Sequence, residues 1–430
     1  MDVAITIGAA VVFFLLIMVS VGLHEIGHMA PARLFGVRVP QYSIGFGPKL
    51  WSRTFGDTEY ALKAFPLGGS VRLLGMYPPA SGRPSRWRRL GEWADSAREF
   101  EWDEISDIDV TAERLLFQKK VWQRVVIMAS GPLMNLLICF VIMWCILGAY
   151  GMYQSQPVIA GVSACVKPVT ATDQTCTAAD PLSPAAAAGL RAGDRVVAFN
   201  GVAITSYDQL MSLIRANLDG EARITVERGG VAVELTPVHT MLNQVTDTWD
   251  PSVTVSAGFL GVTPTQELVR GGPVEALDQM GTMIGQSAVA LVKLPMSVWN
   301  VMADLFAGKP RSQTSPMSIV GASWVAGEVV TAEGVDWQAK VVMFASLLAS
   351  INLFLAVFNF VPLPPLDGGH ILGAAWDGLR RLWARLRRKD MPRPFDTAKL
   401  LPVAYVVTVF LILCGVALIV ADIVSPLRLF

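Results

Sequence analysis

The sequence contains few charged residues for its length. Of its 430 residues, 16% are Asp, Glu, Lys or Arg and 53% are hydrophobic, whereas about a quarter of the residues in a soluble globular domain are charged. The 35 basic and 35 acidic residues cancel. This balance argues against nucleic acid as a partner, because chains that bind nucleic acid carry a basic excess. The composition therefore favours a membrane protein.

Cysteine is also scarce. The five cysteines form no CxxC pair, which excludes the usual cysteine-rich zinc sites. Cys139, Cys145 and Cys414 lie in apolar runs, where cysteine packs as a small hydrophobic residue. Cys165 and Cys176 share a polar segment. A disulfide between them is expected only if that segment lies outside the cytosol, so their state stays open at this point.

Four apolar runs, residues 3–23, 125–150, 341–361 and 400–424, are long enough to cross a membrane, since about 20 residues span a hydrocarbon core of about 30 Å. The first run has no basic region before it and no small-residue cleavage site after it, so we expect a retained helix and not a signal peptide. Residues 273–306 show helical apolar spacing. We expect them to lie along the membrane or to pack on the core, without forming a fifth span.

Lys and Arg are concentrated in the two connections that join spans one and two and spans three and four. Short connections rich in these residues stay in the cytoplasm. Both termini and residues 151–340 are then expected outside the cytoplasm, with the chain in the cell (inner) membrane. The basic residues are Arg83, Arg86, Arg88, Arg89, Lys119, Lys120 and Arg124 in the first connection, and Arg380, Arg381, Arg385, Arg387, Arg388 and Lys389 in the second.

The first span ends in the pattern H-E-x-x-H, formed by His24, Glu25 and His28. Residues i and i+4 of a helix lie on one face, so both imidazoles can reach one zinc ion. The glutamate between them can hold a water molecule and take its proton. Ionisable residues inside a span are costly and mark functional sites. The alternative is a polar cluster at the water interface.

A third zinc ligand is expected after the third span, in the segment N-F-V-P-L-P-P-L-D-G-G-H at residues 359–370. Its three prolines cannot continue a helix, and irregular backbone at membrane depth survives only where protein buries it or a wet cavity adjoins it. Asp367 follows the prolines and is the candidate ligand. His370 is also possible by residue type, because it can share a helical face with Asp367. The alternative is an interfacial turn with a solvated aspartate.

These motifs resemble the site-2 protease family of intramembrane zinc metalloproteases, peptidase family M50, and specifically its bacterial PDZ-containing branch. In that family, the two histidines of H-E-x-x-H and the aspartate of L-D-G bind zinc, and the glutamate is the catalytic base. The resemblance implies Zn²⁺ as the cofactor, with His24, His28 and Asp367 as metal ligands and Glu25 as the catalytic residue.

Two further motifs carry the same resemblance. The family pattern N-x-x-P-x-P-x-L-D-G implies substrate-binding roles for Asn359, Pro362 and Pro364. The family's G-P-x-x-N matches Gly131 and Asn135, for which either ordinary helix packing or a direct catalytic role is possible.

The resemblance also implies the fold class. We expect a polytopic α-helical membrane protein with about four transmembrane helices, a membrane-associated β region and one extracytoplasmic PDZ (α+β) domain. Residues 42–48 and 60–69 resemble strands of the β region and would offer an edge to an extended substrate. Residues 258–262 are expected to close the PDZ domain, and residues 164–179 to form an insertion in it. The acidic run at 87–110 is expected to be a solvated cytosolic loop.

The expected segments are 1–30 (first transmembrane helix with the zinc motif), 31–82 (β region), 83–124 (cytoplasmic loop), 125–150 (second transmembrane helix), 155–265 (PDZ domain and closing strand), 266–335 (amphipathic linker), 338–375 (third transmembrane helix with L-D-G), 376–399 (basic cytoplasmic loop) and 400–424 (fourth transmembrane helix).

The expected activity is that of a zinc metalloendopeptidase. The resemblance implies cleavage of the transmembrane segment of single-span membrane proteins, such as anti-sigma factors or remnant signal peptides, in regulated intramembrane proteolysis. One alternative is a non-catalytic membrane PDZ adaptor or chaperone, against which the intact Glu25 argues. Another is a metal transporter, but the sequence lacks ligand sets repeated in inverted halves.

Overall fold

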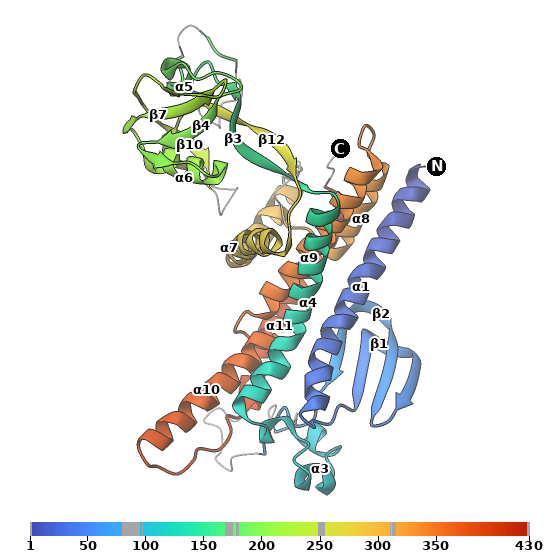
Figure 1. Cartoon of the computed structure of the whole chain (residues 1–430). Coiled ribbons are helices and arrows are strands. Elements are labelled where there is room, and N and C mark those ends of the chain that lie inside the picture. Colours follow the sequence, from blue (N-terminus) through green and yellow to red (C-terminus); the bar gives the residue numbers. More distant parts are fainter. Residues whose placement is uncertain are drawn as a thin grey trace. The chain divides into compact units, whose positions relative to one another are not determined.

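The computed structural model describes residues 2–79, 95–96, 98–167, 175–177, 180–247, 254–309, 311 and 315–427. The chain forms two compact units (Figure 1): a helical unit, Met1–Trp144 with Ala276–Phe430, and a β-rich unit, Cys145–Glu275. The predicted cytoplasmic residues Arg83, Arg86, Arg88 and Arg89, and positions 168–174 and 178–179 of the predicted insertion, lie outside the described residues.

Within the described residues, five helices are long and apolar enough to cross a membrane. Four of them correspond to the predicted spans, and the fifth is α7, which the sequence prediction kept out of the membrane. By length and composition α7 qualifies as a span, although it is the least apolar of the five. The helices are α1 (Asp2–Leu34), α4 (Val121–Ala149), α7 (Pro273–Phe306), α9 (Trp337–Asn359) and α11 (Leu401–Val424), the last preceded by the short η2 (Thr397–Leu400).

A short apolar helix, α8 (Ile319–Thr331), packs against α1 and was not predicted within the 266–335 linker. Their shared core joins Phe13 and Ile17 of α1 to small residues of α8 and to Phe344 of α9. A Cβ at Gly327 would overlap the backbone of α1. Small residues therefore allow the two helices to approach closely, as is common between membrane helices.

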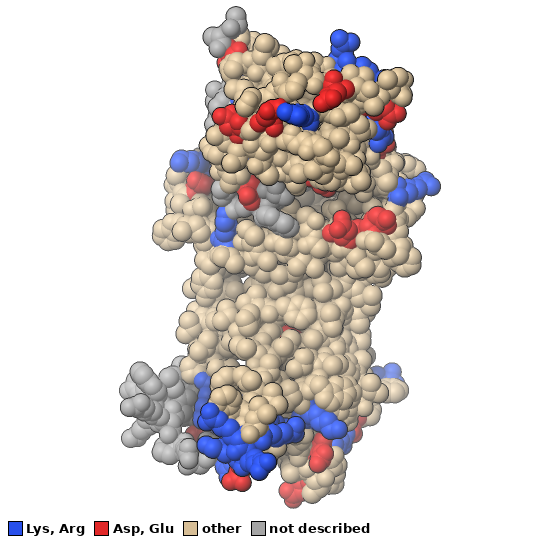
Figure 2. All heavy atoms as spheres, turned by 60° about the vertical axis from the view of Figure 1, so that its left-hand side comes forward, with Lys and Arg blue, Asp and Glu red and all other residues tan. Residues whose placement is uncertain are grey.

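The outer surface of the helical unit divides by charge. Figure 2 shows a broad band with few charged side chains and, at its lower border, a group of Lys and Arg. The spans expose many large apolar side chains to the surroundings, among them Val11 and Leu15 of α1 and Val406 and Leu413 of α11. Such a band suits a hydrocarbon layer, which holds no water to solvate charges.

The strands predicted near residues 42–48 and 60–69 are present as β1 (Gln41–Phe55) and β2 (Thr58–Arg72). The start of β1, at 41–44, pairs with residues 59–62 and also with residues 69–72. The Tyr42 hydroxyl donates to the Gly22 carbonyl of α1 at 2.9 Å. Tyr42 pairs with Val71 of β2, so this contact brings the last part of β2 close to the segment of α1 that carries the H-E-x-x-H pattern.

The acidic run predicted as a solvated loop is only partly solvated. Glu101 is buried, and its carboxylate accepts hydrogen bonds from the backbone N–H groups of Gly75, Met76 and Tyr77 at 2.8, 2.8 and 2.9 Å. Those N–H groups follow β2 and would otherwise lack partners. The prediction was wrong for Glu101 because the groups that bury it come from a distant segment.

Further buried contacts fix this end of the unit. Arg38 pairs at 2.7 Å with the buried Asp109 of the short α3 (Asp107–Thr111). The short η1 (Leu116–Gln118) follows α3 in the chain. Arg124 of α4 pairs with Asp377 of α10 (Asp367–Leu386) at 2.8 Å, and both side chains are buried. The predicted basic loops are thus partly ordered by internal ion pairs.

The β-rich unit contains a sheet with the strand order β12-β3-β4-β7-β8 and a separate hairpin of β10 and β11. Phe199, Leu210, Ile214 and Val226 belong to its core. Its elements are β3 (Met152–Val162), α5 (Pro184–Ala188), β4 (Arg195–Phe199), β5 (Val202–Ala203), α6 (Tyr207–Ala216), β6 (Glu221–Ala222), β7 (Ile224–Arg228), β8 (Val231–Glu234), β9 (Val238–His239), β10 (Met241–Thr246), β11 (Thr254–Phe259) and β12 (Val262–Val269).

The structure bears on two predictions about this unit, the closing strand and the state of Cys165 and Cys176. Residues 258–262 do not form one closing strand; they join β11 to β12, and β12 is the strand that pairs with β3. Gly261 adopts φ +88° at this junction, a conformation that favours glycine. Cys165 and Cys176 form a disulfide, with their Cα atoms 5.8 Å apart. The pairing that the sequence left open is therefore present in the structure.

A buried carboxylate joins the start of β4 to β7. Arg228 donates two hydrogen bonds of 2.7 Å to Asp194, and the Arg191 N–H donates a third at 2.9 Å. The hydrogen bonds from Arg228 hold the pKa of Asp194 below its ordinary value.

Replacing Asp194 with Asn is expected to destabilise the β-rich unit by about 2 kcal/mol near neutral pH, because Arg228 loses its anionic partner. A depressed pKa means that this stabilisation is complete above the unfolded-state pKa of about 3.9 and is lost as the pH falls through the lower folded-state value. Amide exchange in β4 and β7 of the full chain, corrected for intrinsic rates, measures the free energy of unfolding of this unit. The difference in that free energy between wild type and Asp194→Asn should become smaller below about pH 4. A difference that stays constant below about pH 4 would contradict a stabilising role of the ionised Asp194. Asp219→Asn changes an exposed aspartate and serves as the control.

Candidate metal centre

The two histidines of the H-E-x-x-H pattern face the same point. His24 and His28 lie one turn apart on α1, and both are buried. Their Nε2 atoms are 3.2 Å apart, and their rings stand nearly at right angles, at 82°. The helical spacing therefore brings two imidazole nitrogens together, as the sequence predicted.

The third side chain arrives from the other end of the chain. Helix α9 ends at Asn359, a turn rich in proline follows, and α10 begins at Asp367. The Oδ2 atom of Asp367 lies 3.4 Å from His24 Nε2 and 3.3 Å from His28 Nε2. A Cβ at Gly369 would lie 2.7 Å from the Pro364 nitrogen. Glycine here lets the turn fold back on the first turn of α10.

The three atoms form a nearly equilateral triangle with sides of 3.2, 3.3 and 3.4 Å. Ligands at 2.0–2.1 Å from a tetrahedral zinc ion would stand about 3.3–3.4 Å apart. The geometry and the donor types therefore fit zinc with a fourth position left open. Among the described residues, this is the group of at least three His, Cys, Asp or Glu side chains whose donor atoms converge closely enough for a metal ion.

Neighbouring groups orient both imidazoles. The Nδ1 atom of His28 lies 2.8 Å from the Ile127 carbonyl and donates its proton there, which leaves the Nε2 lone pair for a metal. The Nδ1 atom of His24 lies 3.3 Å from the Asn135 amide nitrogen, while the Asn135 Oδ1 is buried without a hydrogen-bond partner. Turning this amide by 180° would place its oxygen on the His24 Nδ1–H and satisfy both groups. Asn135 thus contacts a predicted ligand, a role that the sequence did not distinguish from helix packing or catalysis.

Gly131 of α4 lies directly against the His28 ring, because a Cβ at this position would overlap the imidazole Nε2. Gly131→Ala is therefore expected to displace His28 and to lower both zinc content and activity by at least about tenfold, the lower range seen when a group that orients a ligand is lost. Elemental analysis of the purified variant measures the zinc. Gly8→Ala on α1 is the matched control, since its Cβ would meet nothing within 4 Å. Full zinc retention in Gly131→Ala would contradict the packing argument.

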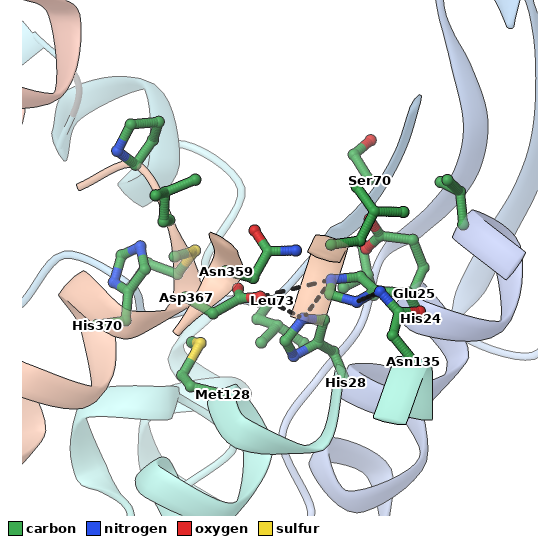
Figure 3. A pocket seen from close by; sticks show the side chains of 16 residues that line it. His24, Glu25, His28, Ser70, Leu73, Met128, Asn135, Asn359, Asp367 and His370 are labelled. Atoms are coloured by element: carbon green, nitrogen blue, oxygen red, sulfur yellow. Dashed lines mark hydrogen bonds and ion pairs between the residues drawn. The ribbon is translucent and has the colours of Figure 1, made fainter. Parts of the chain in front are cut away.

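A cavity of about 310 Å³ opens beside the triangle. Glu25 lines it, and Figure 3 shows its side chain next to His24. A Cβ at Gly69 would lie 2.8 Å from Glu25 Cγ, so the backbone of β2 passes directly beside this carboxylate. Ser70 and Val71 of the same strand also line the cavity.

Only some of the other predicted site residues line the cavity. Asn359 lines the cavity beside Asp367 (Figure 3), but Pro362 and Pro364 are not among its lining residues, whereas the following Pro365 is. His370 also lines the cavity, yet its ring lies on the side of Asp367 away from the two histidines and outside the converging group. This geometry favours Asp367 over His370 as the third ligand.

Comparison with known proteins identifies the family. The model of peptidase family M50 matches residues 12–401. The chain belongs to peptidase family M50. Its relatives include the zinc metalloprotease Rip1 of Mycobacterium tuberculosis (strain ATCC 25618 / H37Rv), 34% identical over 434 residues, and that of Mycolicibacterium smegmatis, 33% identical over 437 residues; each alignment covers 98% of both chains. Members of this family are membrane proteases that act on membrane-embedded substrates, and the apolar helices of this chain agree with a place in the membrane.

Proposed function

We propose that this protein is a zinc-dependent intramembrane endopeptidase that cleaves the membrane segments of single-span proteins. The observation that carries the proposal is the Glu25 carboxylate beside a ready triangle of His24, His28 and Asp367, at a cavity bordered by a β-strand. The two relatives are named zinc metalloproteases and match this chain along nearly its whole length. The test is cleavage of a tagged single-span reporter by the purified protein in micelles.

His24, His28 and Asp367 would hold Zn²⁺ through two Nε2 atoms and one carboxylate oxygen. When bound, zinc lowers the pKa of a water molecule toward about 7 and polarises the carbonyl that is attacked. Glu25 would act as the proton carrier: its carboxylate would accept a proton from the attacking water molecule as the water oxygen bonds to the scissile carbonyl carbon. Glu25 would then deliver that proton to the leaving nitrogen as the C–N bond breaks, which returns its carboxylate to the starting state.

The position of β2 supports substrate binding in extended form. Residues 69–72 pair with 41–44 of β1, and Gly69 lies against Glu25. A peptide in an intact helix shields its own backbone, whereas a peptide added as a strand presents each carbonyl in turn. Asn359 lines the cavity, where its amide can bind the substrate backbone. Pro362 and Pro364 would act by shaping the turn that precedes Asp367.

The proposed topology places the metal centre toward the cytosol in the cell membrane, with both termini and the β-rich unit outside. Four spans put the basic residues before α4 and those of α10 on one side, as the preference of Lys and Arg for the cytoplasm requires. A fifth span between them would separate these groups. We therefore assign the less apolar α7 to the outer membrane surface.

We assign the β-rich unit to a PDZ domain, which would bind or exclude parts of substrates outside the membrane. Its sheet with two short helices supports this assignment. The proposed substrates are anti-sigma factors or remnants of signal peptides, which offer a single span.

A further inference from the structure

Helix α10 turns a long apolar stripe to the outside. Its exposed positions are spaced alternately by four and three residues, which places them on one face of a helix. Each exposes half or more of its surface, from 50% to 75%. The stripe consists of Leu372, Trp376, Leu379, Trp383 and Leu386, with Leu382 beside it. Nothing in the described part of the chain covers this face.

The opposite face of α10 is fixed to the protein. Gly373, Ala374, Asp377 and Ala384 are buried there. The Asp377 carboxylate pairs with Arg124 of α4 at 2.8 Å and accepts the Phe395 N–H at 2.6 Å. The helix therefore cannot turn its apolar stripe inward without breaking a buried ion pair, which is costly.

Basic side chains border the stripe on both sides. At about 100° per residue, Arg380 and Arg387 fall along one border and Arg385 along the other, and Arg388 and Lys389 follow the end of the helix. Figure 2 shows a group of Lys and Arg side chains at the lower end of the helical unit. The Arg387 guanidinium stacks over the Trp383 ring, 4.2 Å from its centre.

Few acidic side chains of the described residues approach these cations. The acidic neighbour that the described part of the chain offers Arg380 is Asp377, at 3.8 Å, and that carboxylate already binds Arg124. Within the described residues, no acidic side chain lies at ion-pair distance from Arg385, Arg387 or Arg388. An external partner must therefore offer an apolar phase and negative charge together.

We infer that the outer face of α10 binds the cytoplasmic surface of the membrane, with its Leu and Trp side chains among the acyl chains and its Arg side chains on anionic phospholipid headgroups. An amphipathic helix with a basic polar border is suited to this position. The inference depends on the membrane placement proposed above but not on the catalytic roles.

The position of α10 links this surface to the metal centre. Asp367 is the first residue of α10, and the apolar stripe begins five residues later. Lipid contact along the stripe would hold the outer part of the helix, while the Arg124–Asp377 pair holds its middle. Anionic lipid would in this way steady the element that presents one metal ligand.

The test uses the full chain in nanodiscs of phosphatidylcholine alone or mixed with phosphatidylglycerol, with amide exchange over residues 375–389 followed by mass spectrometry. Each Arg near an anionic surface strengthens binding roughly fivefold. We expect exchange to slow by on the order of tenfold when phosphatidylglycerol is present, and added salt to reverse the effect.

The triple variant R385Q/R387Q/R388Q should lose the response to phosphatidylglycerol, whereas R385K/R387K/R388K should keep it. R191Q/R195Q/R223Q in the β-rich unit is the matched control for net charge. Exchange in α9 reports whether each variant is folded. The inference would be overturned if residues 375–389 of the wild type exchanged equally fast in both lipid mixtures, or if the glutamine variant kept the response to phosphatidylglycerol. It would also be overturned if these residues were protected only in discs that hold two copies of the protein. None of these readouts involves proteolysis, so they separate this inference from the proposed activity.

Discussion

Glu25→Gln is expected to abolish cleavage of a single-span reporter while leaving the metal content unchanged. Glutamine keeps the size of the side chain but cannot accept the proton of the attacking water. Loss of a general base typically costs 10²–10⁴-fold in rate, so we expect at least about a hundredfold decrease. Glu25 is not part of the triangle of His24, His28 and Asp367, and zinc measured by elemental analysis should equal that of wild type. Cleavage at the wild-type rate would refute the assigned role.

Two controls make this result specific. A chelator should stop cleavage by the wild-type protein, and added zinc should restore it, whereas zinc should not restore Glu25→Gln. Glu234→Gln changes an exposed carboxylate on β8 of the β-rich unit and should cleave normally. If the wild type does not cut the reporter at all, a second reporter with helix-breaking residues in its span tests whether presentation of the substrate was limiting.

The H-E-x-x-H part of the centre was predictable because it depends on local geometry alone. A helix places residues i and i+4 on one face whatever surrounds it, so His24 and His28 meet without help from other segments. Asp367 is a different case, because it lies more than 300 positions away and reaches the histidines through the pairing of α1 with later helices. The proline run indicated a break at membrane depth, but the choice of Asp367 over His370 needed either the family resemblance or the structure.

Three features that the sequence did not predict depend on partners distant in the chain. The acidic run containing Glu101 has the composition of a solvated loop, yet three backbone N–H groups after β2 surround its carboxylate. Helix α8 was missed because 13 residues are too few for a span, and its burial exists only against α1. Asn135 carried no local sign of its contact with His24. None of these contacts follows from the residues nearby in the sequence.

Asp367→Ala is expected to remove zinc from the purified protein. The substitution leaves two protein ligands where a catalytic zinc site uses three. Loss of an outer-sphere partner already costs about 10–100-fold in metal affinity, so loss of a direct ligand should cost at least about a hundredfold. Zinc retained after dialysis against a weak chelator, measured by elemental analysis, should fall from near stoichiometric to a trace, and cleavage should fall with it.

His370→Ala is the control that makes the zinc measurement decisive. Both residues lie in the first turn of α10 and line the same cavity, so a general disturbance of this turn would affect both variants alike. Only Asp367 points its side chain at the two imidazoles. We therefore expect His370→Ala to keep its zinc. Zinc lost from His370→Ala but kept by Asp367→Ala would exchange the two assignments. Zinc lost from both would indicate that the turn, and not one carboxylate, holds the metal.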